Sequence, residues 1–201
     1  MNQKLYKYTD RIIRYLNLYS IRKFENVKSM GSFDELNVID VSHELYDDLV
    51  RVTKECYLKL ALHIYKTYKT DDSFIREITE MWVADVLKEY NPVTMYVFEH
   101  EVDRKRSRFV ESVIASVNKA EEIEKSLRYW SRMITQYAID ITDKAMLQAY
   151  KDDGITKVLW FTVEDERRCK KCRELNDKIF DIDKIPPKPH WGCRCYLKAY
   201  K

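Results

Sequence analysis

Glycine and proline are scarce in this sequence. Among its 201 residues there are only three glycines, at positions 31, 154 and 192, and four prolines. These two residue types mark most turns and breaks, so the chain is expected to form long helices joined by few turns. Extended apolar runs are missing as well, and no stretch approaches the roughly 18–20 residues that a membrane-spanning helix needs.

The N-terminal stretch MNQKLYKYTDR lacks the apolar segment of a signal peptide. We therefore expect the protein to be made and kept in a reducing cytoplasm. Four of its five cysteines lie between residues 169 and 195. Clustered cysteines in a reducing compartment bind metal more often than they form disulfides.

A strong net charge is also absent. The chain has 36 basic and 33 acidic residues, a formal net charge of +3, which does not point to any class of partner. The distribution is uneven, because residues 167–201 hold 11 basic and only four acidic residues. Such a basic tail fits an anionic partner, and it equally fits a solvated face that offsets the charge of zinc-bound thiolates.

Apolar residues recur every three or four positions along residues 1–153, which predicts a body of long helices. The expected helices cover residues 3–25, 42–69, 73–90, 92–117 and 120–151. Ser42 is expected to cap the second helix through its hydroxyl, and Gly154 to form the left-handed turn after the last one. Cys56 lies on an apolar stripe and is expected in the core.

Two features of these helices have alternative explanations. Residues 99–108, EHEVDRKRSR, form either a nucleic-acid-binding face or a solvated helix with ion pairs, and the spacing of Glu101 and Lys105 favours ion pairs. Tyr129, Trp130 and Tyr137 are interpreted as core residues rather than as a platform for stacked bases.

After Gly154 the pattern changes. Residues 157–163, KVLWFTV, are rich in β-branched and aromatic residues and are typical of a strand, and residues 179–180 and 195–197 are candidates for two more. Three short strands make a marginal sheet that needs a staple such as a metal site. The sequence therefore predicts a mainly α protein. A helical body, residues 1–153, precedes a small α+β module, residues 154–201, whose short β-sheet is stapled by a Cys/His metal site.

The module contains C-x2-C, then 17 residues, then H-x2-C-x-C. The candidate ligands are Cys169, Cys172, His190, Cys193 and Cys195. Zinc prefers four tetrahedral thiolate or imidazole ligands, so we expect one structural zinc ion and one spare candidate. Cys169, Cys172 and His190 are expected to bind, with Cys193 or Cys195 as the fourth ligand. A cysteine-rich site without His190, and disulfides in place of a metal, are the alternatives.

Enzymatic chemistry has less support. A cysteine nucleophile needs a partner base, which His190 could provide for Cys193 or Cys195, and Asp165 with His190 could serve a metal nuclease. Four crowded cysteines fit metal ligation better, and a chain with three glycines has no Gly-rich phosphate-binding loop. We therefore expect no catalytic residues, no organic cofactor and no enzymatic activity.

The C-terminal residues resemble a known family. Trp160, Thr162 and Asp165 precede the C-x2-C pair, a Leu-Asn-Asp-Lys turn at 175–178, and His-Trp-Gly-Cys-Arg-Cys at 190–195. This series resembles the C-terminal domain of phage Mu F-like head morphogenesis proteins, also called minor head or minor capsid proteins, most strongly over residues 123–197.

The sequence departs from the family pattern at two places. Asn176 and Asp177 stand where the family turn has a glycine, and both residue types tolerate the left-handed conformation. Trp191 stands where proline is usual. Neither change removes a candidate metal ligand.

The resemblance implies a virion protein that is assembled in the host cytoplasm and located in the head interior or at the portal vertex. It implies partners among portal and capsid proteins, which the helical part would face. It also implies contact of the basic C-terminal region with double-stranded DNA during packaging or DNA ejection.

Three hypotheses follow from these observations. The first is a non-enzymatic phage minor head protein with a zinc-binding C-terminal module. The second is a zinc-dependent nucleic-acid-binding protein that is not tied to a virion. The third is a hydrolase that uses the Cys/His cluster.

Overall fold

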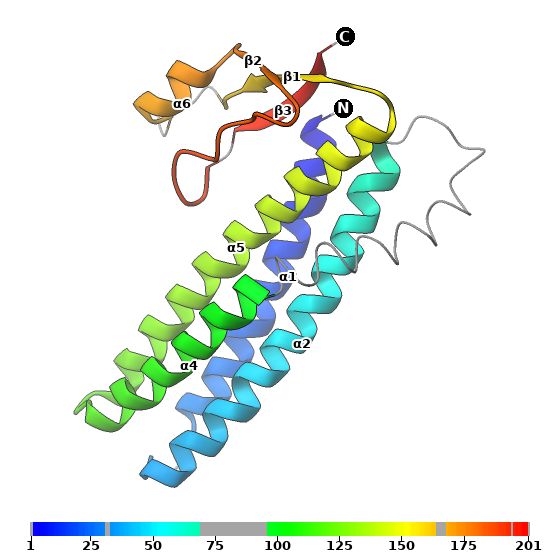
Figure 1. The fold of residues 1–201 in the computed structure, drawn as a ribbon. Coiled ribbons are helices and arrows are strands. Elements are labelled where there is room, and N and C mark those ends of the chain that lie inside the picture. Colours follow the sequence, from blue (N-terminus) through cyan, green and yellow to red (C-terminus); the bar gives the residue numbers. More distant parts are fainter. Residues whose placement is uncertain (1, 31–32, 69–95, 164–167, 194, 201) are drawn as a thin grey trace.

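Figure 1 shows the computed structural model, which describes residues 2–30, 33–68, 96–163, 168–193 and 195–200. Its helices are α1 (Asn2–Lys28), α2 (Glu35–Tyr68), α4 (Tyr96–Ala115), α5 (Lys119–Asp152) and the short α6 (Lys170–Leu175). Its strands are β1 (Lys157–Phe161), β2 (Ile179–Asp181) and β3 (Tyr196–Tyr200). The prediction of a mainly α chain with a small C-terminal sheet is confirmed. The helix expected over residues 73–90 lies outside the described residues.

The four long helices of the described part form a bundle in which α5 contacts α1, α2 and α4. Each helix buries the face on which its apolar residues recur. Aromatic rings meet edge to face at the centre, where Trp130 lies 5.6 Å from Tyr46 and 5.9 Å from Phe98 between ring centroids. None of the described helices is long and apolar enough to span a membrane.

Two residues of this bundle test the assignments made from the sequence pattern. Tyr129 is 54% exposed, and the Lys105 ammonium lies 4.4 Å from the centre of its ring. Its assignment to the core was wrong, because one residue along a helix turns a side chain by about 100° away from the buried Trp130. Cys56, by contrast, is buried as expected, at 7% exposure.

Helix α2 begins at Glu35 rather than at Ser42. The carboxylate of Asp34 accepts a hydrogen bond from the backbone N–H of Asn37 at 2.9 Å, which is an N-cap contact. Ser42 is buried inside the helix, where its hydroxyl donates to the Ile39 carbonyl at 2.7 Å. The prediction that Ser42 caps the helix was wrong, because Asp34 provides that cap earlier in the chain.

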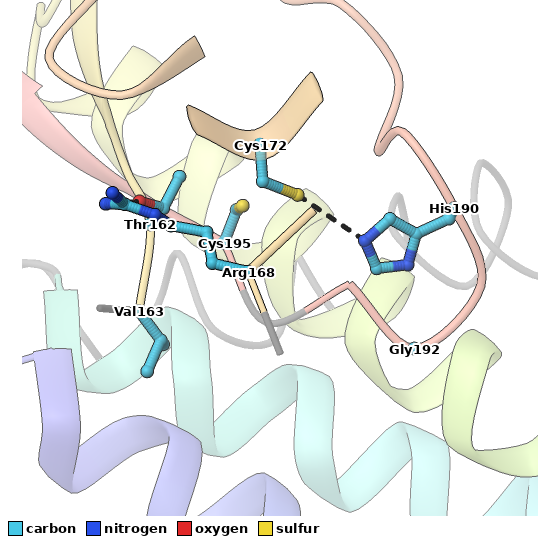
Figure 2. Close-up of a pocket in the computed structure, with 7 residues that line it drawn as sticks. All are labelled: Thr162, Val163, Arg168, Cys172, His190, Gly192 and Cys195. Carbon is cyan, nitrogen blue, oxygen red and sulfur yellow. Dashed lines mark hydrogen bonds between the residues drawn. The ribbon is translucent and has the colours of Figure 1, made fainter. Parts of the chain in front are cut away.

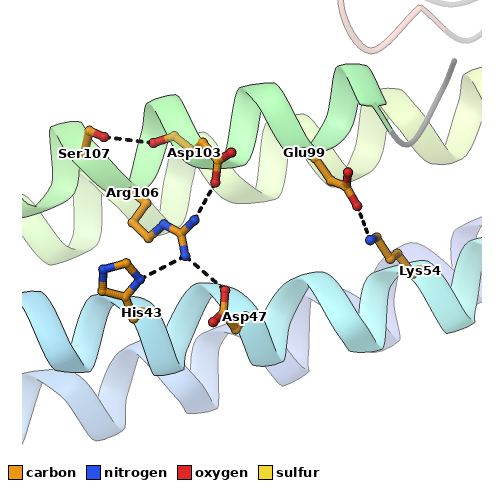
Figure 3. Close-up of polar contacts among 7 residues, drawn as sticks. All are labelled: His43, Asp47, Lys54, Glu99, Asp103, Arg106 and Ser107. Atoms are coloured by element: carbon orange, nitrogen blue, oxygen red, sulfur yellow. Dashed lines mark hydrogen bonds and ion pairs between the residues drawn. The ribbon is translucent and has the colours of Figure 1, made fainter. Parts of the chain in front are cut away.

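The densely charged part of α4 forms ion pairs with α2 (Figure 3). One guanidinium nitrogen of Arg106 lies 3.0 Å from a carboxylate oxygen of Asp47 and 3.2 Å from Nδ1 of His43. Lys54 and Glu99 form a second pair between the same two helices. The explanation by ion pairs is confirmed, although Glu101 pairs with Arg104 and the Lys105 ammonium lies over the Tyr129 ring. Exposed pairs contribute only about 0–1 kcal/mol each, so they add little to the stability of the bundle.

The sheet lies at one end of the bundle, with strand order β2-β1-β3 and both pairs antiparallel. Gly154, with φ +72°, forms the left-handed turn between α5 and β1 that was expected. Trp160 of β1 lies opposite Leu197 of β3, and both are buried. Buried residues of the sheet and of the bundle belong to one continuous hydrophobic cluster. The division into two domains near residue 154 therefore stays a prediction.

Candidate metal centre

Cys169 and Cys172 lie at the beginning of α6. Cys169 is the N-cap residue, with extended backbone, and its sulfur accepts a hydrogen bond from the backbone N–H of Cys172 at 3.3 Å. This hydrogen bond lowers the pKa of the Cys169 thiol. The turn keeps the two sulfurs within 4.8 Å of each other, as the C-x2-C spacing predicts.

The other candidate ligands come from the segment that precedes β3. Figure 2 shows His190 facing Cys172, with 3.4 Å between the imidazole Nε2 and the sulfur. The sulfur of Cys193 lies 3.7 Å from that of Cys172. The backbone N–H of Cys193 donates to the His190 carbonyl at 3.2 Å, in a turn where Gly192 has φ +68°. Cys195 is buried just before β3 begins.

The five side chains form two groups that share Cys172. One group is Cys169, Cys172 and His190, the other is Cys172, Cys193 and Cys195, and within each group the donor atoms lie within 4.8 Å of one another. In tetrahedral zinc sites two sulfur ligands are about 3.8 Å apart, and a sulfur and a nitrogen about 3.6 Å. The observed 3.7 Å and 3.4 Å are close to these values. These two distances and the donor types fit ligands of a zinc ion, although no four of the donor atoms among the described residues all lie within 4.8 Å of one another.

Burial acts against charged thiols in this cluster. It raises the pKa of Cys172 to about 11, with a further contribution from the hydrogen bond to Cys169. A hydrogen bond with Cys195, and then burial, raise the pKa of Cys193. A divalent cation reverses this balance, because a coordinating thiol is deprotonated outright. Metal binding here is therefore expected to release protons and to weaken in acid.

The side chain of Trp160 places a hydrogen-bond donor beside the cysteine sulfurs. Trp160 is 1% exposed, and its indole N–H has no oxygen or nitrogen acceptor among the described residues. The indole also lowers the pKa of the neighbouring Cys195, whose pKa is lowered first by its contact with Cys193. Buried donors are nearly always paired. A donor left beside this group of sulfurs fits a site in which the sulfurs carry negative charge.

Backbone contacts explain several residues that carry the family resemblance. The N–H of Asp177 donates to the Trp160 carbonyl at 2.8 Å, and the Trp160 N–H donates to the Lys178 carbonyl at 2.9 Å. The side-chain oxygen of Asn176 accepts hydrogen bonds from the N–H and hydroxyl of Thr162 at 2.9 and 3.1 Å. Asp177 has φ +59°, the left-handed conformation expected there. These contacts fix α6 beside the end of β1. The role of Asn176 was missed, because in sequence it looks like an ordinary turn residue.

Comparison with known protein families shows to which family the chain belongs. A family model described as "Phage Mu protein F like protein" matches residues 99–198, about half of the chain. The chain belongs to the phage Mu F-like family. No curated protein and no solved structure shows significant similarity to it.

The match of this phage Mu F-like protein covers most of α4, all of α5 and the C-terminal module into β3. It includes all five candidate ligands, and it reaches further toward the N-terminus than the expected 123–197. Asp165 and Arg194, two residues of the resemblance, lie outside the described residues. Family membership indicates a protein of phage head morphogenesis, in agreement with the first hypothesis.

Proposed function

We propose that the protein is a non-enzymatic minor head protein of a phage virion, which associates with portal and capsid proteins in the head interior or at the portal vertex. The observation that carries this proposal is the family match over residues 99–198, since it spans the α4–α5 pair and the module together. The helical bundle supports a structural role. Its α1 and α2 lie before the matched region and are the candidates for the surface that faces the portal or capsid.

Co-expression with the portal protein of the same phage tests this function. A tagged chain should elute with the portal ring in size-exclusion chromatography, and mass spectrometry should find the chain in purified virions. The proposal would be contradicted if the chain bound neither portal nor capsid proteins and was absent from virions.

We further propose that the Cys/His cluster holds one structural zinc ion. Cys169, Cys172 and His190 would bind it, together with either Cys193 or Cys195. Four protein ligands leave no position for water, as in structural rather than catalytic zinc sites. The bound ion would supply the positive charge that keeps the buried thiols ionised. It would also join the α6 half of the module to the segment before β3.

Contact with DNA is a second candidate function, favoured by the outer face of the sheet. The rings of Phe161 and Tyr196 stack across β1 and β3, with centroids 5.5 Å apart and an angle of 11° between the planes. The Lys198 ammonium lies 3.8 Å from the centre of the Phe161 ring. All three side chains are partly exposed. A lysine beside partly exposed aromatic rings fits a nucleic-acid backbone with a neighbouring base. The same face would serve a nucleic-acid-binding protein outside virions.

Fluorescence anisotropy with labelled double- and single-stranded DNA, at several salt concentrations, tests this second function. Lys198→Ala should weaken binding several-fold and lower the slope of log affinity against log salt by about 1. Lys59→Ala, at an exposed position of α2, is the matched control. Absence of DNA binding by the unaltered chain would refute DNA contact and would leave the head assignment standing.

A further inference from the structure

The segment that carries His190 and Cys193 is fastened to helix α5 of the bundle. The backbone N–H of Gly192, between these two candidate ligands, donates to the side-chain oxygen of Gln136 at 2.8 Å. The amide nitrogen of Gln136 donates in turn to Asp140, one turn further along α5, at 2.9 Å. The turn that presents the candidate ligands is thus held by a side chain of the helical body.

Lys188 makes a second and more deeply buried connection. Its ammonium lies 3.0 Å from a carboxylate oxygen of Asp143 on α5, and the two side chains are only 10% and 12% exposed. The same ammonium donates to the backbone carbonyl of Cys195 and lies 5.6 Å from the centre of the Trp160 ring. Lys188 therefore joins α5, the last candidate ligand and the buried tryptophan. Breaking such a buried pair leaves an uncompensated charge and is costly.

We propose that Gln136 and Asp143 of α5 are positioning residues for the metal centre, so that zinc binding and docking of the module on α5 stabilise each other. The proposal rests on the proposed zinc site. It goes beyond that site, because the ion then links the module to the helical body in addition to holding the module together.

The physical basis is thermodynamic linkage. Gln136 and Asp143 hold Gly192 and Lys188, and so fix the position in which His190 and Cys193 meet Cys172. If the segment is no longer fixed in this position, zinc must order it on binding. The apparent free energy of zinc binding then becomes less favourable by the free energy of that ordering. By reciprocity, bound zinc must strengthen the contacts with α5 by the same factor. Residues that orient metal ligands typically change metal affinity 10- to 100-fold when they are replaced.

The chain offers a matched control for each substitution. Asp183→Asn breaks another ion pair between the module and α5, with Lys151, in which the side chains are 44% and 74% exposed. Gln148→Ala removes a partly exposed glutamine of α5 whose amide nitrogen donates to Asp152 of the same helix at 2.9 Å. The controls repeat the chemical changes of Asp143→Asn and Gln136→Ala away from the candidate ligands.

The test measures zinc affinity of the full chain by competition with a chelator, and the visible absorption of the cobalt-loaded chain, which reports ligand geometry. Asp143→Asn and Gln136→Ala should each weaken zinc binding about 10-fold or more, and should alter the cobalt spectrum. Asp183→Asn and Gln148→Ala should leave both unchanged. Gln136→Ala removes no charge, so it remains informative if Asp143→Asn fails to fold.

Two results would overturn the proposal, and they have different meanings. If Asp143→Asn and Gln136→Ala both keep the zinc affinity and the cobalt spectrum of the unaltered chain, the positioning role is refuted and the zinc site still stands. Absence of zinc binding by the unaltered chain would refute the zinc site and this inference together.

Discussion

Replacement of Cys172 by serine is the most informative single perturbation of the proposed centre. Cys172 is the one member shared by the two groups of candidate ligands, and its sulfur lies 3.4 Å from His190 Nε2 and 3.7 Å from the Cys193 sulfur. Serine is nearly the same size, but its hydroxyl is not among the usual zinc ligands. Cys172→Ser should therefore remove the ion without creating a large cavity.

The free energy lost with the zinc ion should be large compared with the stability of the small sheet alone. Structural zinc sites of small domains have apparent binding free energies of about 10–16 kcal/mol at neutral pH. That range matches the whole stability of a typical domain, about 5–15 kcal/mol. The three strands have only five, three and five residues, a sheet of marginal stability by itself. Residues 155–200 should thus lose their ordered structure in Cys172→Ser, whereas the bundle should persist.

Elemental mass spectrometry and amide hydrogen exchange measure the two consequences. Zinc should fall from one ion per chain to none, and the amides of β1 and β3 should lose protection while those of α2 keep theirs. Cys56→Ser makes the same chemical change in the bundle core. It should cost about 1–3 kcal/mol for a buried hydroxyl and leave zinc content unchanged. A Cys172→Ser chain that keeps its zinc and its protected strands would refute the reasoning.

Three further predictions concern single positions. Burial alone would raise the pKa of Asp48, but hydrogen bonds led by that from Lys23 hold it at about 2 against a usual 3.8. Asp48→Asn should therefore lower the free energy of unfolding by about 1–2 kcal/mol at pH 7, after allowance for solvent screening. In urea titrations this difference should vanish as the pH falls through 3.8 toward 2, and a difference independent of pH would contradict it. Gly154→Ala should cost about 1 kcal/mol in thermal unfolding, because φ is +72° there; Gly154→Asn should cost less, and equal losses would argue against backbone strain. Cys193→Ser should lose zinc and Cys195→Ser should retain it, since Cys193 lies at ligand distance from Cys172, and the opposite metal contents would reverse that assignment.

Much of the fold follows from local patterns in the sequence. The shortage of glycine and the spacing of apolar residues predict long helices, and Gly154 marks the end of α5 correctly. The beginning of α2 was missed because Ser42 was taken as its cap, although the apolar stripe continues back to Val38, which is 2% exposed. Pairing across the bundle was also out of reach. The partner of Arg106 on α2, Asp47, is 59 residues away in sequence, and only tertiary packing brings them together.

The candidate site shows the same division between local and tertiary information. The C-x2-C spacing predicts a turn that brings Cys169 and Cys172 together, because that contact is local. Gln136, Asp143 and Lys188 could not be predicted as parts of the site. Their side chains are typical of solvated positions, and their roles arise only when the segment before β3 docks on α5.

The metal content of the intact chain tests the central claim most directly. Elemental mass spectrometry should find one zinc ion per chain, and thiol titration after denaturation with a chelator should find all five cysteines reduced. A chain without metal, in which two disulfides replace the free thiols of residues 169–195, would contradict the metal centre.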